Sequence, residues 1–126
     1  MNFANTTLAN AEHQAWLKGL DFYKEDIHIL EKRLLEIASK NTAFEARQGI
    51  EHFQNQFLVQ LNNIAELKHK VKEHVSTYGN MQETIEEVVE SEKLADHENL
   101  KDEYLSFEKV VKELRQEFNG FLSKWM

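Results

Sequence analysis

The chain contains no cysteine and no proline, and only four of its 126 residues are glycine. Without cysteine, disulfide bonds, thiolate metal ligands and cysteine nucleophiles are all excluded. The absence of proline removes the residue that most strongly interrupts helices. Glutamate, lysine, leucine, glutamine and alanine, which all favour helices, are abundant. The composition therefore predicts an all-α fold, and we find no credible β-strand.

Long apolar runs are also missing. No segment approaches the ~20 apolar residues that a membrane-spanning helix needs. The first residues combine neither a basic segment nor an apolar run, so no secretory signal is expected there. The serines have no glycine-flanked nucleophile turn, and no glycine-rich phosphate loop occurs. We expect a cytoplasmic chain that contacts no membrane, contains no catalytic residues and binds no cofactor.

The formal net charge is −7, which argues against nucleic acid as a partner because phosphate binding needs a basic surface. Residues 81–103 contain nine acidic and two basic side chains, so this segment alone accounts for the net charge. We interpret the segment as a solvated helix face. A docking surface for a basic protein partner is the alternative.

Apolar residues recur at alternating intervals of four and three, the spacing of a coiled-coil seam. The first such stripe consists of Trp16, Leu20, Tyr23, Ile27, Leu30, Leu34 and Ile37. The second contains Ile50, Phe57, Ile64, Val71 and Tyr78. The last consists of Leu100, Tyr104, Phe107, Val111, Leu114, Phe118, Phe121 and Trp125. These stripes predict long amphipathic helices at residues 8–39, 42–78 and 98–125.

The last stripe does not extend upstream of Leu100, because the same spacing would place Lys93 and Glu86 in the core. We therefore predict a break at residues 94–99, preceded by a separate helix at 81–94. A chain reversal at this break would leave the last helix protruding from the bundle. We accordingly predict a single domain, an antiparallel bundle of three long helices with the third interrupted. An up-down four-helix bundle is the alternative.

Two Glu-x-x-His sequences, Glu25/His28 and Glu66/His69, resemble in spacing the ligand motifs of ferritin-like di-iron bundles. On ideal helices all four side chains lie about 140° or more from the apolar stripe, and the two pairs lie roughly 18 Å apart along the bundle. His28 and His52 lie nearly level, an arrangement similar to hemerythrin-like bundles. We predict no metal ligands and keep a hemerythrin- or ferritin-like metal-binding bundle as the alternative function.

Four polar residues are candidates for inward positions. His97 continues the last apolar stripe upstream, and His74 lies beside the second stripe. With a tight turn expected near residue 80, these two histidines would be too far apart to bind one ion together. Asp26 and Arg33 lie seven residues apart within a broad apolar arc, where we predict a polar network that fixes helix register.

The outer face of the second helix is unusually poor in charge. It includes His52, Asn55 and Asn62, and we take these residues as a candidate interaction face. Leucines outside the apolar stripes, such as Leu35 and Leu58, are further candidates for a dimer contact. The function predicted from the sequence is therefore non-enzymatic: binding of a protein partner, or self-association as a homodimer.

Overall fold

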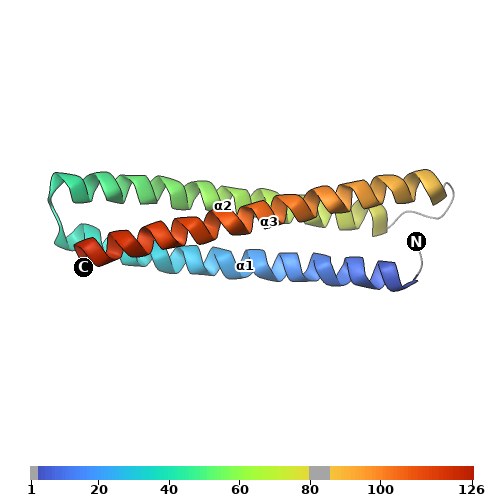
Figure 1. The fold of residues 1–126 in the computed structure, drawn as a ribbon, viewed down its shortest axis with the longest axis horizontal. Helices are drawn as coiled ribbons and strands as arrows, with labels where there is room; N and C mark the ends of the chain where they lie inside the picture. Colours follow the sequence, from blue (N-terminus) through green and yellow to red (C-terminus); the bar gives the residue numbers. More distant parts are fainter. Residues whose placement is uncertain (1–2, 80–85) are drawn as a thin grey trace.

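The computed structural model describes residues 3–79 and 86–126, which form three long helices. These are α1 (Phe3–Lys40), α2 (Phe44–Gly79) and α3 (Glu86–Trp125). α1 and α3 run in the same direction and α2 runs against both, so the molecule is an elongated bundle (Figure 1). The prediction of an all-α bundle of three helices is confirmed.

The predicted interruption at residues 94–99 is wrong, because α3 is a continuous helix. Residues 80–85, which include the predicted start of the helix at 81–94, lie outside the described part of the chain. The apolar stripe of α3 does continue upstream of Leu100, but through polar side chains: His97 is buried and Lys93 is half-buried. A polar residue at an inward position therefore marks a buried contact here and not a break in the helix.

The core consists of the three predicted stripes facing one another. Every member of the α1 stripe from Trp16 to Ile37 is buried. The members of the α3 stripe from Leu100 to Phe118 are buried too, whereas Phe121 and Trp125 are half-buried. Phe57 and Phe118 are fully buried, and their rings meet edge to face at 5.2 Å. Polar side chains cover the rest of each helix. Within the described residues, no helix carries an apolar stretch long enough for a membrane crossing.

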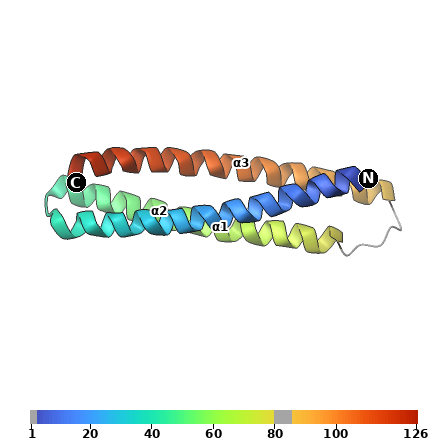
Figure 2. The same cartoon turned by 90° about the horizontal axis from the view of Figure 1, so that it is seen from below.

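Contacts between side chains show the register between α2 and α3, because His74 lies beside His97. α2 ends at Gly79 and α3 begins only at Glu86, beyond the end of α2 in both views (Figures 1 and 2). A tight turn near residue 80 would place Lys70 level with about residue 90, but Lys70 pairs with Glu103 at 3.2 Å; the predicted turn itself lies outside the described residues. The observed pairing shifts α3 along α2 by about twelve residues relative to the predicted tight turn, or roughly 18 Å. The shift decides which side chains share a layer of the core.

Two helical glycines differ in their surroundings and provide a matched test of this packing. A Cβ added at Gly19 would overlap the hydroxyl group of Tyr104, whereas a Cβ at Gly120 would meet nothing within 4 Å. We expect Gly120→Ala to stabilise the protein by up to about 1 kcal/mol, because alanine favours the helix. We expect Gly19→Ala to destabilise it by about 1–3 kcal/mol, because Tyr104 is buried and has to move.

Urea unfolding of both variants, followed by circular dichroism, measures these two changes in the free energy of unfolding. Equal stabilisation by the two alanines would contradict the close approach of α1 to Tyr104.

Candidate metal centre

Each helix contributes one buried histidine to the same layer of the core. His13 lies three residues before Trp16 on α1, His74 lies three residues after Val71 on α2, and His97 lies three residues before Leu100 on α3. His13 and His97 each occupy the next upstream position of their helix's apolar stripe, and His74 lies beside the stripe of α2. Their exposed fractions are only 5–7%. The layer lies toward the end of the bundle where α1 and α3 begin and α2 ends.

The three imidazoles are close enough to share one ion. One ring nitrogen from each can be chosen so that all three lie within 4.8 Å of one another. Ligand nitrogens around a tetrahedral zinc ion are about 3.4 Å apart, given Zn–N bonds of about 2.0–2.1 Å. The largest separation therefore has to shrink by at most roughly 1.4 Å, which rotation of the imidazoles can supply.

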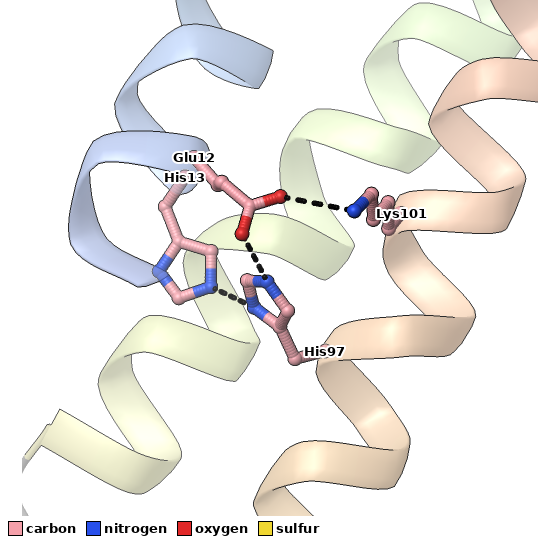
Figure 3. Close-up of polar contacts among 4 residues, drawn as sticks. All are labelled: Glu12, His13, His97 and Lys101. Carbon is pink, nitrogen blue, oxygen red and sulfur yellow. Dashed lines mark hydrogen bonds and ion pairs between the residues drawn. The ribbon is translucent and has the colours of Figure 1, made fainter. Parts of the chain in front are cut away.

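Hydrogen bonds at one edge of the cluster fix the orientation of His97 (Figure 3). Nε2 of His97 lies 3.3 Å from a carboxylate oxygen of Glu12, and the second oxygen of Glu12 lies 3.7 Å from Nζ of Lys101. In the neutral ring, Nε2 donates a hydrogen bond to Glu12, so the lone pair of His97 is on Nδ1. Nδ1 then accepts from Nε2 of His13 at 2.9 Å.

The buried setting favours the neutral form of two of the histidines. Burial, together with the neighbouring His97 and His74, lowers the pKa of His13 to about 4. Burial and His97 also lower the pKa of His74, against an opposing effect of Asp96. Among the described residues, Nδ1 of His13 is buried without a hydrogen-bond partner. Neutral imidazoles with lone pairs inside the core are the form that binds metal ions.

Aromatic side chains cover the side of the cluster that faces the rest of the core. The ring of Trp16 lies 4.9 Å from that of His97 and 6.2 Å from that of Tyr104. Farther along, Tyr23 donates a 2.7 Å hydrogen bond to Glu108, and Tyr104 donates one at 3.4 Å. Burial and Glu108 raise the pKa of Tyr104 to about 12, so this hydroxyl stays protonated.

The other polar residues predicted to face inward are not part of this layer. Asp26 lies at the flank of the core and pairs with Arg115 of α3 at 2.9 Å. The inward placement of Arg33 is wrong: its side chain is exposed. Each helix buries only a narrow stripe, so the edge of the predicted apolar arc, where Arg33 lies, reaches water.

The candidate interaction face of α2 and the Glu-x-x-His sequences are also on the surface. His52, Asn55 and Asn62 are exposed, and His52 lies 3.7 Å from Glu117. His28 and His69 are exposed too, each beside a carboxylate of its own helix. These residues do not meet the buried histidine layer.

The statement that His74 and His97 are too far apart to bind one ion is wrong, because it assumed the tight turn near residue 80. His13 was absent from the candidate residues altogether. One signal in the sequence points to His13 and His97: the apolar stripes of the first and last helices, extended upstream by one more step of three, each reach a histidine. The chain matches no protein-family model, no curated protein and no solved structure.

Proposed function

We propose that this chain is a metal-binding helical bundle that holds one divalent transition-metal ion, zinc first among them, with His13, His74 and His97. The observation that carries the proposal is the convergence of one buried histidine from each helix, with ligand nitrogens within 4.8 Å. Three imidazoles without thiolates suit zinc, copper and nickel better than magnesium or calcium, which prefer oxygen ligands.

The surroundings of the ligands support the same function. Histidines bound to metal ions commonly donate their second ring nitrogen to a carboxylate, which fixes the ring and raises its basicity. Glu12 holds Nε2 of His97 in this way. Asp96 interacts electrostatically with His74 in the sense that strengthens its basicity. Such carboxylates are not needed in a purely apolar core layer.

The direct test is metal analysis of the untagged chain after dialysis against zinc. We expect one zinc ion per chain for the wild type, and less than a tenth of that for His97→Leu. Leucine continues the apolar stripe of α3, so this variant is expected to fold. The control is His28→Leu, an exposed histidine on α1, which is expected to keep full occupancy. Equal zinc content in the two variants would contradict the proposal.

Self-association, the function predicted from the sequence, is the second proposal. Large apolar side chains are exposed on all three helices, among them Leu35, Leu58 and Leu105 at 50–63%. Such residues favour a contact between copies only if they form one continuous patch. Light scattering on the zinc-loaded and zinc-free samples gives the mass. A monomer in both would contradict the dimer.

A further inference from the structure

We infer that the zinc-loaded centre is an open one, with an exchangeable water in the fourth coordination position that hydrolyses small neutral or cationic esters. This inference rests on the proposed metal binding. It concerns what the centre does once the ion is bound, which depends on the number of protein ligands and on access from solvent.

The ligand count is the first observation. Within the described residues, the cluster offers three ligand side chains, all of them histidines. Structural zinc sites are generally closed by four protein ligands, whereas catalytic ones use three and leave the fourth position to water. Three imidazoles also leave both positive charges of the ion uncompensated. Such an ion lowers the pKa of its bound water to about 7.

Glu12 is the nearest candidate for a fourth protein ligand, and its geometry argues against that role. Its two oxygens are directed to Nε2 of His97 and to Lys101. Nδ1 of His97, the nitrogen that would bind the ion, faces Nε2 of His13 instead (Figure 3). Glu12 therefore positions His97 from behind and leaves the fourth position open.

A groove beside one of the three histidines is the second observation, and we infer that it is the route from solvent to the ion. His74 lies in the wall of an open groove of about 360 Å³ between α2 and α3. The charged residues that line this groove are Lys70, Glu73, Asp96 and Glu103. Lys70 is 3.2 Å from Glu103, so the lining carries an excess of two negative charges. The groove therefore admits neutral and cationic molecules and repels anions.

The reaction that we infer is ester hydrolysis by the zinc-bound water beside this negatively charged groove. The bound water loses a proton to solvent, and the resulting hydroxide attacks the carbonyl carbon of the ester. A new carbon–oxygen bond forms, and the bond between that carbon and the leaving alkoxide or phenoxide breaks. The products are a carboxylate and an alcohol or phenol, and a second water takes the vacant position. No oxidant or other reactant is required.

The test uses the full chain loaded with one equivalent of zinc and 4-nitrophenyl acetate, a neutral ester, as the probe. We expect a rate about tenfold or more above that of the metal-free chain and of zinc-treated His97→Leu, increasing with pH around neutrality. The anionic 4-nitrophenyl hemisuccinate is expected to react more slowly, and the double variant Glu73→Gln/Glu103→Gln should narrow that difference.

Cobalt-loaded protein tests the open fourth position separately from metal binding itself. An open centre changes its visible spectrum as the bound water loses a proton, whereas a closed centre does not. Stoichiometric cobalt with a pH-independent spectrum, together with no zinc-dependent hydrolysis, would overturn the open centre and leave the proposed metal binding intact. Failure of zinc and cobalt to bind at all would overturn both.

Discussion

Saturating zinc is expected to raise the midpoint of thermal unfolding of the wild-type chain by about 12 °C. An ion that binds only the folded chain stabilises it by about 4 kcal/mol at a thousand times its dissociation constant. For a domain of this size, 1 kcal/mol corresponds to roughly 3–4 °C. The three ligands come from three helices, so the unfolded chain offers no comparable site. Calorimetry with and without zinc measures the shift.

The variant His97→Leu distinguishes this effect from general binding of zinc to surface carboxylates. We expect its midpoint to be independent of zinc, although leucine in the core should make the metal-free variant at least as stable as the metal-free wild type. His69→Leu, an exposed site on α2, is expected to keep the full shift. An equal shift in wild type and His97→Leu would show that zinc stabilises the chain by binding at another site.

Acidification is expected to destabilise the metal-free protein between about pH 6.5 and pH 4, by up to about 3 kcal/mol from His13 alone. The folded-state pKa of His13, about 4, lies below its ordinary value of 6.5. The unfolded chain therefore binds the proton first as the pH falls. The stability is fully present above pH 6.5 and is lost toward pH 4. The lowered pKa of His74 acts in the same direction.

The groups around His13 determine the size of this effect. Burial and the rings of His97 and His74 disfavour its protonation, with a smaller contribution from Lys93, while Glu12 opposes them. Urea unfolding at pH 7, 5.5 and 4, in the presence of EDTA, measures the loss. His13→Leu removes the titrating group and is expected to show a shallower pH dependence. Identical pH dependence in the two proteins would show that surface carboxylates alone cause the acid transition.

The apolar stripes of α1 and α3 show how much of the fold follows from local pattern. Alternating steps of four and three place Trp16, Leu20 and Tyr23 on one face of a helix whatever its neighbours are. Burial of that face is then the largest available gain, so the stripe predicts the core correctly. The same reasoning failed at residues 94–99, where the inward positions are polar and only a partner on another helix explains them.

The candidate metal centre shows what the sequence pattern could not supply. The sequence by itself determined an all-α bundle, most of the buried stripes of its three helices and the inward position of His97. Only the tertiary structure decided that His13, His74 and His97 share a layer, because helix register depends on where the chain reverses between α2 and α3. A shift of about twelve residues moves a side chain by roughly 18 Å along the bundle. With such a shift, the same buried histidines would not form a cluster.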